Sequence, residues 1–296
     1  MQFVRREFLQ LSAALSAATL LPKTTLAAVN QDSAVDFGFG LVTYLWGADW
    51  DLETLITNCE KTGLRAVELR TTHKHGVEPA LDKKQRAAVA DRFADSSVTL
   101  AGIGSDERFD SPEPEKLNAA IQATKEFIRL SHDVGGSGVK VKPDKFHDGV
   151  PHEKTIEQIG KSLIEVAEFG DGFGQQIRLE VHGQCAELPT IKAIMDVADH
   201  PNVAVCWNSN AQDLAGEGLE HNFNLVRDRF GQTIHVRELN DKSYPYQEFF
   251  DMLVKTDYVG WVLLEASSKP EDRIAALAEQ NELFNALATQ AVNNRK

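Results

Sequence analysis

The sequence has little of several features that would define a class of protein. It holds only 3 cysteines among 296 residues, Cys59, Cys185 and Cys206. They are scattered and cannot all pair, so no disulfide framework is indicated. The apolar run at 9–21 is weak and too short to span a bilayer. No Gly-x-Gly-x-x-Gly follows the first expected strand, and no other glycine-rich phosphate loop is present, which argues against a dinucleotide or a phosphorylated ligand.

Positive charge is also scarce. The chain carries 31 Lys and Arg against 44 Asp and Glu, for a net charge of -13. Such a surface repels phosphate backbones and anionic lipids, so nucleic acid and membrane surfaces are not expected partners. What is present, 42% hydrophobic and 25% charged residues, is the composition of an ordinary globular protein with one large core. Simple solubility is a sufficient reason for the acidity.

The first 28 residues differ from the rest. Arg5 and Arg6 precede a mild apolar stretch, and small residues follow at Ala27 and Ala28. We interpret 1–28 as a cleaved twin-arginine signal peptide and 29–296 as one mature periplasmic domain. Its removal would leave a mature charge of -15. An ordinary amphipathic N-terminal helix is the alternative.

From there on, strand-like and helix-like segments alternate. Runs rich in β-branched and aromatic residues predict strands at 37–46, 66–71, 99–105, 138–143, 176–183, 203–210, 233–239 and 261–267. Amphipathic stretches predict helices at 51–62, 112–134, 152–170, 187–198, 221–230, 246–255 and 271–291. This alternation requires right-handed crossovers and a parallel sheet. Eight units predict an α/β fold, a single-domain (β/α)8 TIM barrel. An open doubly wound sheet is the runner-up.

Alternate strand residues point to opposite sides of a sheet, and the helix-covered side should be aliphatic. In 176–183 the aliphatic residues are Ile177, Leu179 and Val181, so Glu180 points to the barrel axis. The same parity places a polar set on the axis: Glu68, Arg70, Lys140, Lys142, Arg178, His182, Cys206, Asn208, Asn210, His235, Arg237, Glu265 and Ser267.

Isolated buried charges are unfavourable unless they are paired or bound to a cation. Glu180, His235 and Glu265 together suggest a hard-cation site at the carboxyl ends of the strands, where barrels of this kind place active sites. A salt-bridged polar core without a ligand is the alternative. Glu68 and Arg70 are expected to pair with each other.

Four segments carry a resemblance to a known family. They are Leu179-Glu180-Val181-His182-Gly183, Val205-Cys206-Trp207-Asn208-Ser209-Asn210, Ile234-His235-Val236-Arg237 and Leu263-Leu264-Glu265-Ala266. In this order the chain resembles the xylose-isomerase-like TIM-barrel superfamily, in particular the branch of ketose 3-epimerases. The resemblance implies one divalent metal (Mn, Mg, Co or Zn) bound by Glu180, Asn208, His235 and Glu265.

Two positions depart from that pattern. The family has Asp where this chain has Asn208, which removes one ligand charge and should weaken metal binding or abolish it. The family often has a His shortly afterwards, where this chain has Ala211 or Gln212.

The resemblance also implies roles. Glu180 and Glu265 would carry the proton transfers next to a sugar carbonyl. Candidate substrate-binding residues are Lys142, Arg237, His182, Trp46 and His73. His182 could instead orient Glu180, and Trp46 could stack on a sugar or simply pack at the barrel mouth.

The leading hypothesis is a metal-dependent isomerase or epimerase of a non-phosphorylated carbohydrate. The sequence leaves open whether the protein forms a homo-oligomer. One alternative is a periplasmic lyase that cleaves 3-keto-glycosides by β-elimination. Another is a non-catalytic carbohydrate-binding barrel, with Asn208 as the mark of lost chemistry. The endonuclease activity of other superfamily members is disfavoured by the negative charge.

Overall fold

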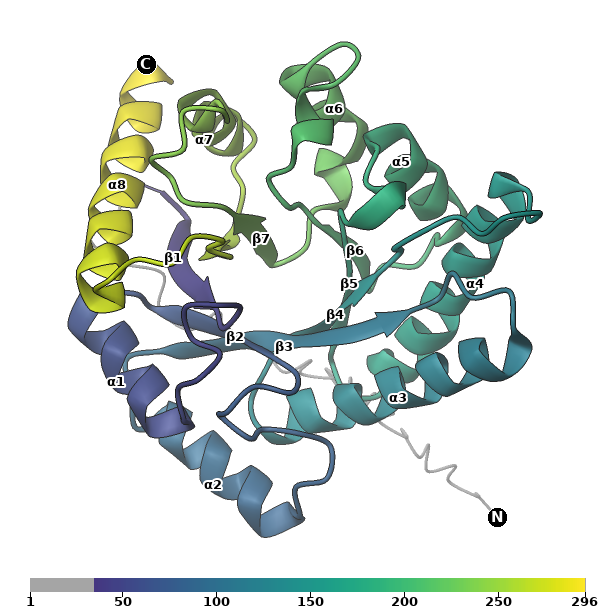
Figure 1. Cartoon of the computed structure of the whole chain (residues 1–296), viewed down its shortest axis with the longest axis horizontal. Helices are drawn as coiled ribbons and strands as arrows, with labels where there is room; N and C mark the ends of the chain where they lie inside the picture. Colours follow the sequence, from purple (N-terminus) through teal and green to yellow (C-terminus); the bar gives the residue numbers. More distant parts are fainter. Residues whose placement is uncertain (1–34, 296) are drawn as a thin grey trace, which may run out of the picture.

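Eight parallel strands form the inner wall of the molecule (Figure 1). The computed structural model describes residues 35–295, so the expected signal peptide at 1–28 lies outside the described residues. The strands are β1 (Phe37–Val42), β2 (Ala66–Arg70), β3 (Thr99–Arg108), β4 (Gly138–Lys142), β5 (Gln176–Glu180), β6 (Val203–Cys206), β7 (Thr233–Val236) and β8 (Gly260–Leu264). Their order, β6-β5-β4-β3-β2-β1-β8-β7, is that of a barrel opened between β6 and β7.

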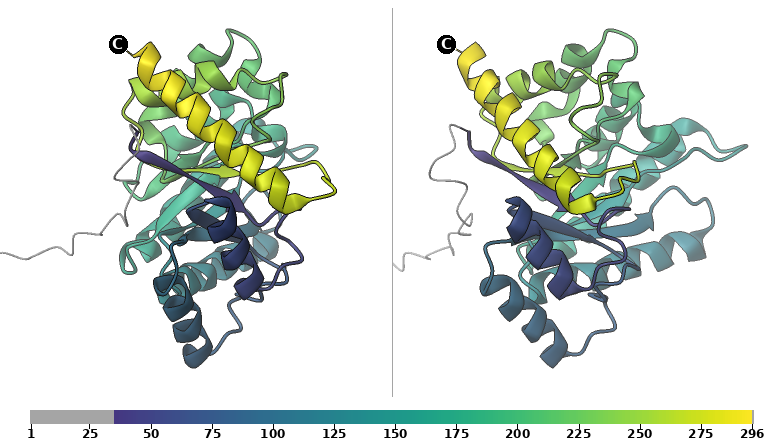
Figure 2. Two further views of the ribbon diagram at one scale, coloured as in Figure 1. Left: turned by 90° about the vertical axis from the view of Figure 1, so that its left-hand side faces the viewer. Right: turned by 60° about the vertical axis from the view of Figure 1, so that its left-hand side comes forward.

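Helices alternate with the strands and cover the outside of the wall. They are α1 (Leu52–Thr62), α2 (Lys83–Ala94), α3 (Pro114–Asp133), α4 (His152–Asp171), α5 (Leu188–Val197), α6 (Leu219–Val226), α7 (Tyr246–Lys255) and α8 (Arg273–Asn294). The predicted (β/α)8 fold is confirmed. Figure 2 shows α8 crossing the outer face of the barrel, where it packs against α1 and α7. Within residues 35–295, no helix combines the length and the apolar character needed to cross a membrane.

The ends of α1 follow from its sequence. The Asp51 side chain accepts a hydrogen bond from the Thr54 backbone N–H, and Gly63 ends the helix at φ 76°. Both residues do what a helix cap requires. By contrast, α2 was missed, because Val89 and Phe93 are its only buried residues and the apolar periodicity is correspondingly weak.

The seam between β6 and β7 closes through short backbone pairings. His235 donates its N–H to the Trp207 carbonyl at 2.7 Å, and Ser209 donates to the His235 carbonyl at 3.1 Å. Asn208 and His235 form a parallel bridge at this point. The closure therefore brings two of the predicted metal ligands side by side.

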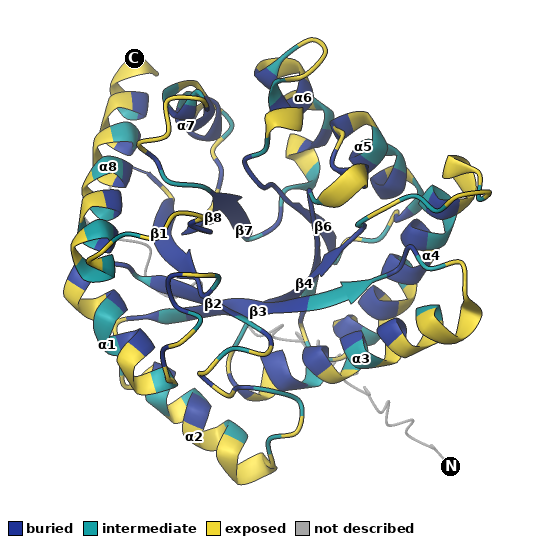
Figure 3. Ribbon diagram, in the orientation of Figure 1, coloured by how far each residue is buried: buried dark blue, intermediate teal, exposed yellow. Residues whose placement is uncertain are grey.

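The predicted two-sided pattern of the strands is confirmed. Ile177, Leu179 and Trp207 are buried in the layer between strands and helices, where Trp207 stacks on Phe249 at 5.6 Å between ring centroids. On the axis, Lys140 is among the charged residues that are also buried. Figure 3 shows buried strands inside a ring of helices whose exposed surfaces face outward.

Candidate metal centre

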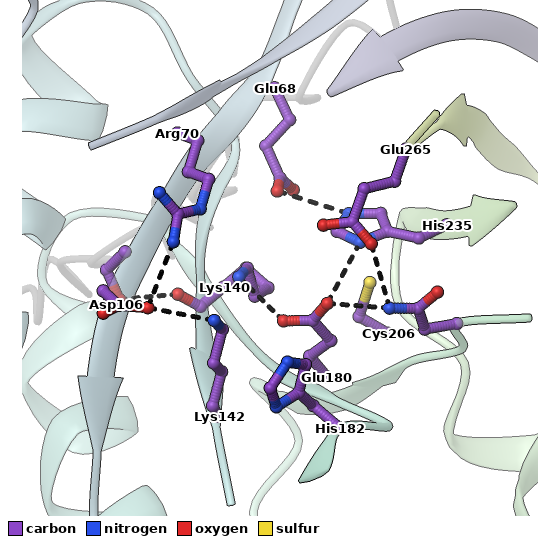
Figure 4. A network of polar contacts seen from close by, with 12 residues as sticks. Glu68, Arg70, Asp106, Lys140, Lys142, Glu180, His182, Cys206, His235 and Glu265 are labelled. Atoms are coloured by element: carbon purple, nitrogen blue, oxygen red, sulfur yellow. Dashed lines mark hydrogen bonds and ion pairs between the residues drawn. The ribbon is translucent and has the colours of Figure 1, made fainter. Parts of the chain in front are cut away.

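Three predicted ligands meet at the carboxyl end of the barrel. Glu180 is the last residue of β5, His235 lies within β7, and Glu265 directly follows β8. One ligand atom from each lies within 4.8 Å of those of the other two. Glu180 and His235 have 0% exposure, and Glu265 has 8%. Figure 4 shows the three side chains converging from different strands. The sequence-based grouping of these residues therefore agrees with the geometry.

The predicted fourth ligand, Asn208, lies between the two carboxylates. Its Nδ2 donates to Glu180 Oε1 at 2.9 Å and to Glu265 Oε2 at 3.1 Å. Its Oδ1 is buried and accepts no hydrogen bond from the described residues. Rotation of the amide would present that oxygen to a cation in place of the NH2 group, since Asn O and N occupy similar positions.

A buried lysine holds Glu180 from the other side. Lys140 Nζ, on β4, lies 2.7 Å from Glu180 Oε2, and both side chains are almost completely buried. Burial alone would raise the pKa of Glu180, but Lys140 and His235 hold it well below its ordinary value. Glu180 is therefore an anion whose charge is compensated within the protein.

Glu68 pairs with His235, and not with Arg70 as the sequence suggested. Glu68 Oε1 lies 3.2 Å from His235 Nε2, while His235 Nδ1 faces Glu180 Oε1 at 3.5 Å. Arg70 points away and pairs with Asp106 at 3.4 Å. The expectation failed because strand neighbours two residues apart share a face but their long side chains reach different partners. Burial would lower the pKa of His235, but Cys206 and Glu68 raise it well above its ordinary value.

The donor set fits a divalent cation. Two carboxylates and an imidazole suit Mn, Mg, Co or Zn according to geometry. A metal-bound His usually gives its second ring nitrogen to a carboxylate. Glu68 stands at that position, fully buried. Together with the buried Asn208 Oδ1, these groups could hold a cation between β5, β6, β7 and β8.

A second group of charges lies beside the centre, on β2, β3 and β4 and in the segments that follow β4 and β5 (Figure 4). Lys142 Nζ and Arg70 Nη2 both contact Asp106 Oδ1, at 2.9 and 3.4 Å. Asp144 contacts Arg108 Nε at 2.8 Å and His182 Nδ1 at 2.9 Å. His182 thus bonds to Asp144, not to Glu180.

Sequence reasoning missed Asp106, Arg108 and Asp144. Strand β3 extends to Arg108, beyond the expected end at 105, and its charged end looks like a loop in sequence. Asp144 follows β4 at φ 62°, in the left-handed region. The sequence did offer one signal: Asp106 and Arg108 are two residues apart and continue the alternation of the preceding strand, so they point to the same side of it.

The remaining predicted substrate residues lie at the barrel mouth in different settings. Trp46 is 3% exposed, and its Nε1 donates to the Ser268 carbonyl at 2.9 Å, so it packs at the mouth. His73 Nδ1 lies 2.9 Å from Thr43 Oγ1. Burial, assisted by Arg70 and His75, lowers the pKa of His73 to about 4. Arg237 Nη1 donates to the Glu265 carbonyl at 3.2 Å and lies 3.6 Å from Glu265 Oε2, so it adjoins the centre directly.

Known structures share this architecture at low sequence identity. An L-ribulose 3-epimerase has a TM-score of 0.75 and 16% identity, covering 87% of this chain and 96% of the other. A 3-keto-D-glucoside 4-epimerase from E. coli has a TM-score of 0.72 and 13% identity, covering 86% and 99%. The IOLI protein, solved with a zinc atom, has a TM-score of 0.70 and 15% identity, covering 88% and 99%. The solved structural neighbours thus include sugar epimerases.

No curated protein matches the sequence. A family model, described as the xylose isomerase-like TIM barrel, matches residues 56–287. That range contains all four ligand segments and every strand except β1. The chain therefore belongs to the xylose isomerase-like TIM barrel family.

Proposed function

We propose that the protein is a divalent-metal-dependent isomerase or epimerase of a non-phosphorylated carbohydrate. The observation that carries this proposal is the convergence of Glu180, His235 and Glu265 at the carboxyl end of the barrel. The solved structural neighbours described as sugar epimerases support the substrate class.

The reaction would be proton transfer at a carbon next to a carbonyl. Glu180, His235 and Glu265, with Asn208, would hold one Mn, Mg, Co or Zn ion. When bound, the cation would stabilise negative charge that develops on the sugar oxygens. At least one of the two glutamates takes the proton, and positioned general bases contribute about 10²–10⁴-fold to such rates.

Groups around the centre would orient the sugar. Arg237 and Lys142 carry donors that suit hydroxyl or carbonyl oxygens, although each also pairs with an acidic group. His182 is 36% exposed at its side chain and can reach a substrate in the mouth. His73 and Trp46 would line the entrance.

A second candidate function is β-elimination from a 3-keto-glycoside, because the same proton abstraction beside a carbonyl initiates it. One structural neighbour is described as acting on a 3-keto-D-glucoside, which supports including such compounds as substrates to test.

The test is incubation of the mature protein in D2O with each of the four metals, ketoses, aldoses and 3-keto-glucosides. We expect deuterium to enter one carbon of a substrate, and Glu265→Gln to lose this exchange. Release of an aglycone would identify the lyase. Sugar binding that is indifferent to chelator, without any deuterium uptake, would contradict the proposal and identify a carbohydrate-binding barrel.

We further propose export to the periplasm by the twin-arginine route, on the basis of Arg5 and Arg6. Replacement of both arginines by lysine should retain the precursor in the cytoplasm, as measured by fractionation. Periplasmic accumulation of the double variant would contradict this route.

A further inference from the structure

The two glutamates of the centre differ in how many of their oxygens are engaged. Both carboxylate oxygens of Glu180 have partners. Its Oε1 faces Asn208 and His235, on the side of the candidate cation, and its Oε2 faces Lys140 at 2.7 Å. In Figure 4, dashed lines reach both carboxylate oxygens of Glu180. Neither oxygen is left to approach a substrate carbon.

Lys140 is fixed in this contact by its surroundings. Its side chain is 2% exposed and rises from β4, where Lys140 is paired with Arg178, two residues before Glu180 on β5. A buried ammonium without its carboxylate would be strongly unfavourable, so the pair resists separation. The contact also lies on the side of Glu180 away from Asn208 and His235, and would persist with a cation bound.

Glu265 has a free oxygen. Its Oε2 accepts from Asn208 and lies near Arg237, whereas no residue in the described range 35–295 contacts its Oε1 within hydrogen-bond distance. Its side chain is 11% exposed, against 1% for Glu180. Glu265 is therefore the carboxylate that a sugar entering the mouth can reach.

We propose that Glu265 is the only base of the reaction and that Lys140 is a positioning residue, which keeps Glu180 as a fixed anion. This inference rests on the proposed function and narrows it. Inversion at a carbon requires proton removal on one face and delivery on the other, hence two acid–base groups. A single base returns the proton to the face it came from, which favours aldose–ketose isomerisation over epimerisation.

The proton balance of this reaction is simple. Glu265 Oε1 removes the proton from C2 of an aldose, the C2–H electrons form the double bond of an enediolate, and the carbonyl π electrons move to O1. Glu265 then returns the proton to C1, O2 gives up its hydroxyl proton, and O1 takes one from solvent. The product is the ketose, and no oxidant or reductant is consumed.

The first test uses the wild-type protein, reconstituted with Mn²⁺, and pentoses and hexoses deuterated at C2, in H2O. We expect the ketose as product by NMR, with part of the deuterium carried to C1 and no epimer. An epimer whose label has been replaced wholly by solvent hydrogen would overturn the single-base inference alone. If no sugar exchanges any carbon-bound hydrogen, the proposed function fails and the inference fails with it.

The second test is Lys140→Met, which frees Glu180 Oε2. We expect an epimer to appear as a new product beside the ketose, because a second carboxylate becomes available. A purely structural lysine would lower the rate without changing the product. The control is Lys125→Met, which removes an ion-paired lysine (2.7 Å from Glu165) outside the barrel and should leave the products unchanged. An unchanged product from well-folded Lys140→Met would contradict the role of Lys140; if that variant does not fold, the labelling of the wild type decides.

Discussion

Glu68 lies outside the candidate ligand set but contacts one of its members, His235. Its carboxylate lies 3.2 Å from His235 Nε2 in a fully buried environment, which leaves Nδ1 directed at the candidate cation. The tautomer and the ring orientation of His235 therefore depend on Glu68.

We predict that Glu68→Gln weakens Mn²⁺ binding by about 10–100-fold, the usual cost of removing such an outer partner. Gln keeps the volume of the side chain and loses its charge. Titration calorimetry on chelator-treated protein measures the effect, with Glu165→Gln, an exposed substitution on α4, as the control. Equal affinities for the wild type and Glu68→Gln would show that the carboxylate does not tune His235.

Asp213 is a buried acid outside the candidate metal centre. Its Oδ2 accepts from Tyr244 Oη at 2.8 Å and from the Asn210 N–H at 2.9 Å. Burial raises the pKa of Asp213 from 3.8 to about 7, against the opposing effect of these hydrogen bonds. The folded protein therefore binds this proton more tightly than the unfolded chain does.

The protonated Asp213 should stabilise the fold fully below about pH 4, and this contribution should disappear as the pH rises to about 7. Over that range the free energy of unfolding should fall by up to about 1.4 kcal/mol per pH unit. Asp213→Asn removes that slope. We therefore predict that the free energy of unfolding of Asp213→Asn, relative to that of the wild type, is higher at pH 8 than at pH 5. Urea unfolding of both proteins at the two pH values measures this difference. Parallel changes in the two proteins would contradict the raised pKa.

At the element scale, periodicity predicted all eight strands and the faces they present. The parity of β5, with Ile177 and Leu179 outward, was enough to place Glu180 on the axis. The ends of elements were less predictable, because they depend on contacts between segments. Strand β6 stops at Cys206, so Asn208 lies in the seam with β7 and not inside a strand.

Helix α2 has a capping motif that is visible in the sequence, but its apolar face is too small to be recognised there. Asp82 and Gln85 form a capping box, each side chain bonding the other's backbone N–H at 2.9 Å. We predict that Asp82→Ala lowers the free energy of unfolding by about 1 kcal/mol. Urea denaturation measures this, with Lys83→Ala as the control at the next, exposed position. An effect no larger than that of Lys83→Ala would indicate that the cap contributes nothing.

At the scale of the whole molecule, the barrel gathers charges that are far apart in the chain. Glu68, Lys140, Glu180 and His235 come from four strands, and Glu265 directly follows a fifth. Their burial is possible only because each has a partner of opposite charge. The set of axis residues could be predicted from sequence. Their pairing could not, because Lys140 with Glu180 and Glu68 with His235 are chosen by side-chain reach across the barrel.

Comparison with solved structures likewise supports the fold but does not define the reaction. Identities of 13–16% with the described neighbours show a shared barrel, and a shared fold does not fix a reaction. Under the proposed function, the reaction would depend on individual side chains such as Asn208 and Lys140. A test of the centre must therefore measure this chain's own groups.

The most direct measurement is Mn²⁺ titration of chelator-treated protein by calorimetry, for the wild type, His235→Gln and the exposed control His152→Gln. We predict one ion per chain in the wild type and the control, and binding at least about 10-fold weaker in His235→Gln. No saturable binding by the wild type, or binding that His235→Gln leaves unchanged, would contradict the claim that Glu180, His235 and Glu265 form a single cation site.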